Sequence, residues 1–221
     1  CKVNAYETEA MQHLLEEAGY EIVPFTQKAD VYVINTCSVT NMADRKSRQM
    51  LHKAKKNNPD SIVVAAGCYV QTSEKEVLND LSVDIVIGND RKHDLVRLLE
   101  EYSLDSVNDT VDDINDGKHD FEELFIDQTK EHTRAFIKVQ DGCNQFCSYC
   151  IIPYARGRVR SRRFENVIAE VERLAANGFK EVVLTGIHLS SYGVDFEEAT
   201  GLLELIQACL LCTSPSPRDY A

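Results

Sequence analysis

The sequence predicts an α/β fold in which an amino-terminal domain with a doubly wound parallel sheet is followed by the first portion of a partial (β/α) barrel. Three observations predict this class. Short runs of apolar and β-branched residues alternate with segments of helical spacing. Two of these runs end at a cysteine, and the same alternation resumes after a strongly acidic stretch. A chain of 221 residues has room for about two domains.

The strands of the first domain, residues 1–102, are predicted where apolar runs have the length of a strand. Because strands and helices alternate, we expect the strands to be parallel, with ligands bound beyond their carboxyl ends. The predicted strands are Val31 to Asn35, Ser61 to Gly67 and Val83 to Gly88.

The helices of this domain are predicted from their spacing and from start and stop residues. Asn4 followed by Glu7 has the pattern of a capping box, so we expect a helix from there through Glu17, with Gly19 as its stop. The other helices are expected over Asp44 to Lys56, opened by Asn41 and halted by Pro59, and around Asp94 to Tyr102.

An acidic segment, residues 103–133, separates the two predicted domains. It holds ten acidic residues against Lys118 and Lys130, and so carries −8 of the formal net charge of −12. Periodic apolar residues are few, and we interpret the segment as the interdomain linker. The charge that would repel an RNA backbone is therefore mainly confined to this stretch.

The barrel portion, residues 134–207, is predicted from two strands and the helices that follow them. Thr185 to His188 fall at the carboxyl end of the second strand, where barrel enzymes place their catalytic loops. The predicted strands are Arg134 to Gly142 and Lys180 to Gly186, and the predicted helices are Phe164 to Asn177, with Gly178 as stop, and Leu202 to about Leu211.

Six of the eight cysteines form two groups of three. The carboxyl-terminal triplet, Cys143, Cys147 and Cys150, lies in one short polar loop. A zinc finger would show two pairs of ligands with a spacer, and a bacterial ferredoxin would show a longer run of cysteines. Three thiolates are one short of the four that close an iron–sulfur cluster, so one iron would remain open to a small molecule.

The amino-terminal triplet consists of Cys1, Cys37 and Cys68. Cys37 and Cys68 stand at the carboxyl ends of predicted strands, and Cys1 would stand there too if a strand preceded it. Because the carboxyl ends of parallel strands meet at one edge of a sheet, we expect these thiols to gather there. Strand-end cysteines with no chemical role are the alternative.

The carboxyl-terminal triplet has the CxxxCxxC pattern of radical S-adenosylmethionine enzymes. With the amino-terminal triplet, it makes the chain resemble the methylthiotransferase family of these enzymes. The branch that acts on N6-threonylcarbamoyladenosine in tRNA is the one whose sequence is most similar. The similar segments are CKVNAYETEA, VYVINTCSVTN, AAGCYVQTS, DGCNQFCSYCIIPYARGRVRSR and EVVLTGIHLSSYG.

This resemblance implies two [4Fe-4S] clusters, one on each triplet, and S-adenosyl-L-methionine as cofactor. Tyr149 would lie against the adenine of the cofactor, and Thr185, Gly186 and His188 would face its amino group. The implied reaction inserts sulfur and a methyl group at C2 of N6-threonylcarbamoyladenosine next to the anticodon of tRNA. The implied partners are tRNA and an electron donor such as flavodoxin or ferredoxin. His188 is otherwise an ordinary histidine at a strand end.

A basic stretch follows the carboxyl-terminal triplet. Alternating arginines there would hold RNA phosphates or the cofactor carboxylate, or would form a solvated face. These residues are Arg156, Arg158, Arg160 and Arg162. Tyrosines that could stack on a splayed base are Tyr69, Tyr149, Tyr154 and Tyr192, each of which could instead pack in the core.

Two other functions fit the pattern. Within the same family, the substrate could be isopentenyladenosine in tRNA or an aspartate of a ribosomal protein, although Lys2-Val3-Asn4 differs from the start that those branches show. A non-catalytic iron–sulfur or zinc protein that binds nucleic acid is an alternative of another class. It needs a fourth protein ligand at each site.

The ends of the chain also carry expectations. The sequence starts with Cys and holds only the beginning of a barrel, so we expect a fragment that is inactive by itself. Residues 208–221 do not continue the family pattern, and the two cysteines within them, Cys209 and Cys212, are expected to have no role in metal binding. Cysteines arranged in triplets are better explained by metal ligation than by a disulfide framework, which indicates a cytoplasmic protein, and no apolar run has the length of a membrane span.

Overall fold

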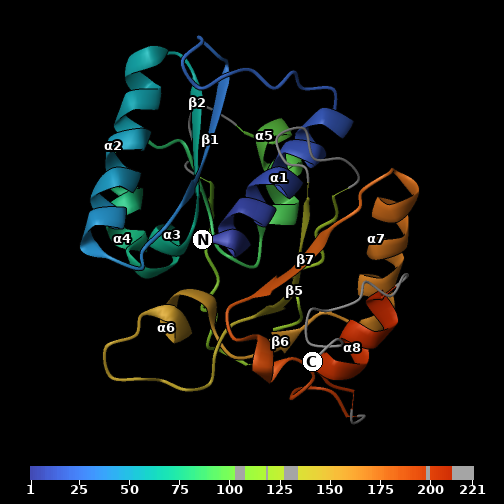
Figure 1. The fold of residues 1–221 in the computed structure, drawn as a ribbon. Coiled ribbons are helices and arrows are strands. Elements are labelled where there is room, and N and C mark those ends of the chain that lie inside the picture. The colour runs from blue at the N-terminus through green and yellow to red at the C-terminus, as the bar shows by residue number, and fades with distance from the viewer. Residues whose placement is uncertain (103–107, 118, 127–133, 198–199, 211–221) are drawn as a thin grey trace.

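The computed structural model describes residues 1–102, 108–117, 119–126, 134–197 and 200–210. Its first half contains a parallel sheet with the strand order β1-β2-β3-β4, of which β1 and β2 are labelled in Figure 1. The strands are β1 (Val31–Thr36), β2 (Ile62–Gly67), β3 (Ile85–Ile87) and β4 (Asn108–Thr110). The predicted α/β class is confirmed.

Helices cover both faces of this sheet, as a doubly wound sheet requires. Met11 and Leu15 of α1 (Lys2–Glu17) share a core with Leu95 and Leu98 of α5 (Leu95–Glu100). The opposite face is covered by α2 (Asn41–Asn57), α3 (Cys68–Thr72) and α4 (Glu74–Leu78). The two short helices α3 and α4, and the 3-10 turn η1 (Lys92–Asp94), were not predicted because they are too short to show a helical period.

The predicted capping box at the start of α1 is wrong. Cys1 is the N-cap, and its sulfur accepts a hydrogen bond from the backbone N–H of Asn4 at 3.3 Å. The Asn4 side chain instead donates to the carbonyls of Asn35 and Thr36, and Glu7 is fully buried. The cap of α2 is likewise Thr40 and not Asn41. The difference at α1 arises because a pattern of residue types does not show which polar side chain has a tertiary partner, and the difference at α2 is a shift of one residue.

The acidic segment is more structured than its composition predicts. It contributes β4 to the edge of the first sheet. Beyond this strand, Ile114, Leu124 and Ile126 are buried, and Leu124 and Ile126 pack against Tyr6 and Ala10 of α1. Within residues 108–117 and 119–126, the connection between the two halves is therefore a packed strap and not an open chain.

The second half contains a three-stranded sheet with the order β6-β5-β7. The strand β5 (Ala135–Asp141) pairs parallel with β7 (Val182–Gly186) and antiparallel with the unpredicted β6 (Arg160–Ser161). α7 (Phe164–Ala176) packs on β5 through Val167, Val171 and Leu174. The remaining elements are α6 (Ile152–Arg156), η2 (Leu189–Ser191) and α8 (Leu202–Cys209).

The two halves meet where α1 lies against β5 and β7 (Figure 1). Among the described residues, no helix is both long enough and apolar enough to cross a membrane.

Candidate functional site

The carboxyl ends of β1 and β2 place Cys37 and Cys68 beside each other. The two strands pair in register up to Thr36 and Gly67, and each cysteine is the next residue along its chain. Gly67 has φ +96°, and a Cβ there would lie 2.5 Å from Oδ1 of Asn35 and 2.6 Å from the carbonyl oxygen of Thr36. Only glycine allows the chain to turn this closely beside its neighbour and to start α3 at Cys68.

Cys1 is brought to the same edge by α1. The amide of Asn4, three residues along the helix, donates to the carbonyls of Asn35 and Thr36 at 3.3 Å each. The oxygen of the Asn4 backbone accepts in return from the side chain of Asn35 at 3.1 Å. This exchange fixes the first turn of α1 against the end of β1, immediately before Cys37. Cys1 is exposed, Cys37 is half-buried and Cys68 is buried.

The loop with the carboxyl-terminal triplet closes on the residues that follow it. The backbone N–H of Cys143 donates to the carbonyl of Gly157 at 3.0 Å, and that of Cys150 donates to the carbonyl of Cys147 at 2.9 Å. Gly142, which leads into the loop, has φ +68°, and a Cβ there would lie 1.8 Å from the carbonyl oxygen of Arg158. The loop is therefore folded tightly on backbone contacts.

A strained aromatic residue lies inside this loop. Phe146, directly before Cys147, has φ +45°, a left-handed conformation that bulky residues rarely adopt. The guanidinium of Arg158 lies 4.3 Å from its ring centroid, and Tyr154 packs edge-on against it with centroids 5.7 Å apart. Strain of this kind concentrates at functional sites, where the surrounding contacts hold it in place.

The donors present in both triplets fit a cluster bound by thiolates. All six cysteines, like Cys209, are free thiols. In the described part of the chain, no three His, Cys, Asp or Glu side chains come close enough to hold one metal ion. An iron–sulfur cubane is larger than one ion, and each thiolate binds a different iron, so its donors stand farther apart than the ligands of zinc.

One buried side chain, that of Gln140, links the carboxyl end of β7 to the loop of the carboxyl-terminal triplet. Its Nε2 donates to the carbonyls of Asp141 at 2.6 Å and Gly142 at 2.8 Å. Its Oε1 accepts from the backbone N–H of His188 at 2.7 Å. Thr185 is buried and Gly186 is half-buried beside it. The structure thus brings Thr185, Gly186 and His188 together with the entry to the cysteine loop.

The four tyrosines considered for stacking separate into two kinds. Tyr149 and Tyr154 are 90% and 58% exposed, next to the carboxyl-terminal triplet. Tyr69 and Tyr192 are buried. The hydroxyl of Tyr69 accepts a hydrogen bond from Arg48 and donates one to Glu76, and the hydroxyl of Tyr192 donates to the carbonyl of Arg162. The stacking hypothesis is wrong for the two buried rings.

The prediction that the four arginines hold RNA phosphates is wrong for three of them. Arg156, Arg160 and Arg162 are 1%, 5% and 0% exposed. Each is paired with carboxylates inside the protein: Arg156 with Glu7 and Asp141, Arg160 with Asp90, and Arg162 with Glu123 and Glu170. Arg158 is exposed. Arg156 ends α6, Arg160 begins β6 and Arg162 follows β6, so the three buried arginines do not belong to one exposed strand face.

A cluster of buried charges fills the junction between the two halves. Its members come from α1, η1, the acidic segment, β5 and α6. This junction cluster consists of Glu7, Lys92, Glu122, Lys138, Asp141 and Arg156.

Glu7 is the centre of the junction cluster. Its carboxylate accepts two hydrogen bonds from the guanidinium of Arg156, at 2.8 and 3.1 Å, and one from Lys138 at 3.0 Å. Lys92 lies 3.6 Å away. Arg156 also donates to both oxygens of Asp141, at 3.1 and 3.0 Å. Three cations thus meet three carboxylates, so the charges balance within the protein itself.

The pKa shifts agree with this balance. Burial by itself would raise the pKa of the Glu7 carboxyl, but Arg156, Lys92 and Lys138 hold it well below its usual value. Burial would also raise the pKa of Asp141, and Arg156 and Lys138 lower it. For Arg156, burial opposes the charged form, while the carboxylates of Asp141 and Glu7 raise its pKa well above the usual value.

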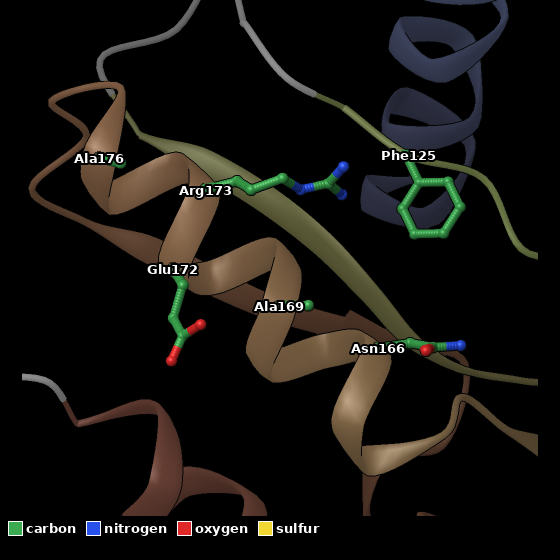
Figure 2. Close-up of a pocket in the computed structure, with 6 residues that line it drawn as sticks. All are labelled: Phe125, Asn166, Ala169, Glu172, Arg173 and Ala176. Carbon is green, nitrogen blue, oxygen red and sulfur yellow. The ribbon is translucent and has the colours of Figure 1, made fainter.

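A surface hollow elsewhere in the molecule is not the candidate site. Figure 2 shows it between α7 and the ring of Phe125, lined by Asn166, Ala169 and Arg173 among others. It has no cysteine in its wall. The second hollow lies beside the junction cluster and is lined by residues that include Asp90, His93 and His119. Neither hollow contains a residue of the two triplets.

The sequence pattern does not identify the residues of the junction cluster. It places Glu7 in a cap and assigns no role to Lys138 or Asp141. A signal was present, because Lys138 lies between the apolar residues Ile137 and Val139 of a predicted strand, where a lysine is buried only when it is paired. Lys92 and Asn89 follow a buried strand and carried no such signal.

Comparison with known proteins agrees with this two-part architecture. The family described as "Uncharacterized protein family UPF0004" matches residues 1–88, and the Radical SAM superfamily matches residues 137–219. The threonylcarbamoyladenosine tRNA methylthiotransferases MtaB of Bacillus subtilis and Aquifex aeolicus are 46% and 45% identical over 90% and 94% of this chain. The tRNA-2-methylthio-N(6)-dimethylallyladenosine synthase of Bacillus mycoides is 34% identical over 100% of it.

The chain belongs to the radical SAM methylthiotransferase family. It covers 44%, 51% and 46% of the lengths of these three members, which is about half of each. The match to the Radical SAM superfamily extends past residue 207, where the resemblance was expected to end, and residues 211–221 lie outside the described residues.

Solved structures support the fold of this chain. The radical S-adenosylmethionine methyltransferase TsrM from Kitasatospora setae, with cobalamin and a [4Fe-4S] cluster bound, superimposes with a TM-score of 0.58. The identity is 14%, and the match covers 92% of this chain and 47% of that one. At this identity, the likeness concerns the fold alone.

Proposed function

We propose that the protein to which this chain belongs methylthiolates tRNA, inserting sulfur and a methyl group at C2 of N6-threonylcarbamoyladenosine. The observation that carries the proposal is the pairing of two free-thiol triplets, each beyond the carboxyl ends of its own sheet, across one buried junction. The identities of 37–46% to enzymes named for this nucleoside, against 34–35% to those named for dimethylallyladenosine, support this substrate.

The two triplets would each hold one [4Fe-4S] cluster with an open iron. With S-adenosyl-L-methionine, such a cluster supplies the radical chemistry that an unreactive aromatic C–H bond requires, because no side-chain base can remove that hydrogen. The side chains of the protein position the groups around the cluster. Gln140 holds the loop of the carboxyl-terminal triplet against the end of β7, so that Thr185, Gly186 and His188 form one wall beside it.

Tyr149 and Tyr154 would supply the stacking surface for cofactor or base, since both are exposed beside the carboxyl-terminal triplet. Of the four arginines, Arg158 would be the contact to an RNA phosphate, because it is the exposed one. An electron donor of the flavodoxin or ferredoxin class would reduce the clusters.

Iron content tests the two-cluster assignment. Replacing Cys143, Cys147 and Cys150 by alanine is expected to leave about half of the iron and sulfide of the anaerobically reconstituted chain, because each triplet binds its own cluster. Replacing Cys1, Cys37 and Cys68 should have the same effect. Elemental analysis would contradict the assignment if either set removed all the iron or none, and bound zinc in place of iron would favour the non-catalytic alternative.

Nucleoside analysis tests the substrate. Mass spectrometry of tRNA from cells with and without the full-length gene should show loss of the methylthio derivative of N6-threonylcarbamoyladenosine, with the dimethylallyladenosine derivative unchanged. The opposite pattern would assign the protein to the other branch of the family, and two unchanged nucleosides would reject tRNA as substrate.

A further inference from the structure

Asn89 connects Cys68 of the amino-terminal triplet to α6, the helix that follows the carboxyl-terminal triplet, through a single buried side chain. It lies two residues after β3 and is 1% exposed. Its Nδ2 lies 3.7 Å from the sulfur of Cys68 and 2.5 Å from the carbonyl oxygen of Ala155. Ala155 belongs to α6, which directly follows the loop of the carboxyl-terminal triplet. The same amide group therefore contacts a candidate ligand in one half and the backbone beside the other candidate cluster.

The orientation of this amide is fixed by Lys92. The Lys92 ammonium donates to Oδ1 of Asn89 at 2.8 Å and to its backbone carbonyl at 2.9 Å. An ammonium group has only donors, so the oxygen of the amide must face Lys92 and its NH2 must face the sulfur. Lys92 is itself held by Glu7 of the junction cluster at 3.6 Å.

The backbone of Asn89 is fixed as well. Its N–H donates to Oε1 of Gln71 at 2.9 Å, and Gln71 lies three residues after Cys68 in α3. Asn89 therefore contacts α3 twice, through its backbone at Gln71 and through its side chain at Cys68. Such a donor has little freedom to turn away when the charge on the sulfur changes.

We propose that Asn89 is a positioning residue that donates a hydrogen bond to the sulfur of Cys68 in the amino-terminal cluster and raises the reduction potential of that cluster. The inference rests on the proposed function, which places a cluster there. Reduction adds negative charge to a cluster and its thiolates, and hydrogen bonds to the sulfurs stabilise the reduced form. Because Asn89 also holds Ala155, the strength of this bond depends on how the second half is docked.

The test uses the chain with Cys143→Ala, Cys147→Ala and Cys150→Ala, so that only the amino-terminal triplet can hold a cluster. After anaerobic reconstitution with iron and sulfide, the midpoint potential is measured by a redox titration followed by paramagnetic resonance. Asn89→Leu removes the donor and is expected to shift the midpoint to a more negative potential. Iron content is measured on the same samples.

The matched control is Asn58→Leu. Asn58 is also buried and donates its side-chain amide to a backbone carbonyl, that of Ala29 at 2.8 Å, but at the opposite end of the sheet. It should lose similar stability without a change in potential. An unchanged potential in Asn89→Leu, or an equal shift in both variants, would overturn the inference.

A second variant covers the case in which Asn89→Leu holds no iron. Asn89→Asp keeps the size of the side chain and the acceptor for Lys92 but turns an oxygen toward the sulfur, so it should also lower the potential. A cluster with unchanged potential in this variant rejects the role of Asn89 and leaves the proposed function intact. Absence of any cluster in the parent chain with the three alanines would reject the amino-terminal cluster, and this inference with it.

Discussion

Glu7→Gln is expected to lower the free energy of unfolding by about 3–5 kcal/mol, which is the usual cost of removing one partner from a buried ion pair. The carboxylate of Glu7 is fully buried and accepts from Arg156 and Lys138, with Lys92 at 3.6 Å. Glutamine keeps the shape but removes the charge, so three buried cations would face only Glu122 and Asp141. An uncompensated buried charge is the reason for the large effect.

Urea unfolding of the two proteins measures this difference. The matched control is Glu17→Gln, the same exchange at the exposed end of the same helix, where Glu17 pairs with His13 at 3.5 Å. The control should change stability by less than about 0.5 kcal/mol. Equal midpoints for Glu7→Gln and the unmodified chain would show that the junction cluster does not stabilise the fold.

Gly142→Ala is expected to abolish iron binding at the carboxyl-terminal triplet while leaving the amino-terminal triplet loaded. The new Cβ would lie 1.8 Å from the carbonyl oxygen of Arg158, 2.5 Å from its carbonyl carbon and 2.7 Å from the carbonyl oxygen of Gly157. These are backbone atoms, so no side-chain rotation relieves the contact. The backbone at Gly157 has little room to move away, because it is packed closely against Ile114: a Cβ built on Gly157 would lie 2.6 Å from the carbonyl oxygen of Ile114. The loop would have to open at Cys143.

The control for Gly142→Ala separates steric overlap from backbone strain. Gly178 follows α7 with φ +93°, and no atom lies within 4 Å of its Cβ position. Gly178→Ala therefore has only the cost of a left-handed alanine, about 1–2 kcal/mol, and should keep all its iron. Iron analysis after reconstitution compares the two variants. Full iron in Gly142→Ala would show that the loop tolerates an open form.

The sequence predicted the parts of this fold that depend on local pattern. Apolar runs located β1, β2, β5 and β7, and the cysteines after β1 and β2 could be assigned to one sheet edge because neighbouring parallel strands end together. The metal role of the six cysteines stays a prediction.

Pairing across long stretches of sequence could not be predicted. Arg156 meets Glu7, and Arg160 meets Asp90, although these partners are far apart along the chain. A row of arginines after a cysteine loop has the same pattern whether it faces RNA or buried carboxylates. The acidic segment was misjudged for the same reason, since Ile114, Leu124 and Ile126 find their contacts in α1 and elsewhere only after folding.

The strands β1 and β2 end in register, and this affects how a cluster is held at the amino-terminal triplet. The separation of Cys37 and Cys68 is set by the ladder of peptide hydrogen bonds and by the turn at Gly67, neither of which uses a metal ligand. Zinc fingers, in contrast, gain their structure from the metal and unfold when a chelator removes it. Because backbone pairing positions two of the three donors here, we expect a chelator to remove the metal from this triplet without unfolding the sheet.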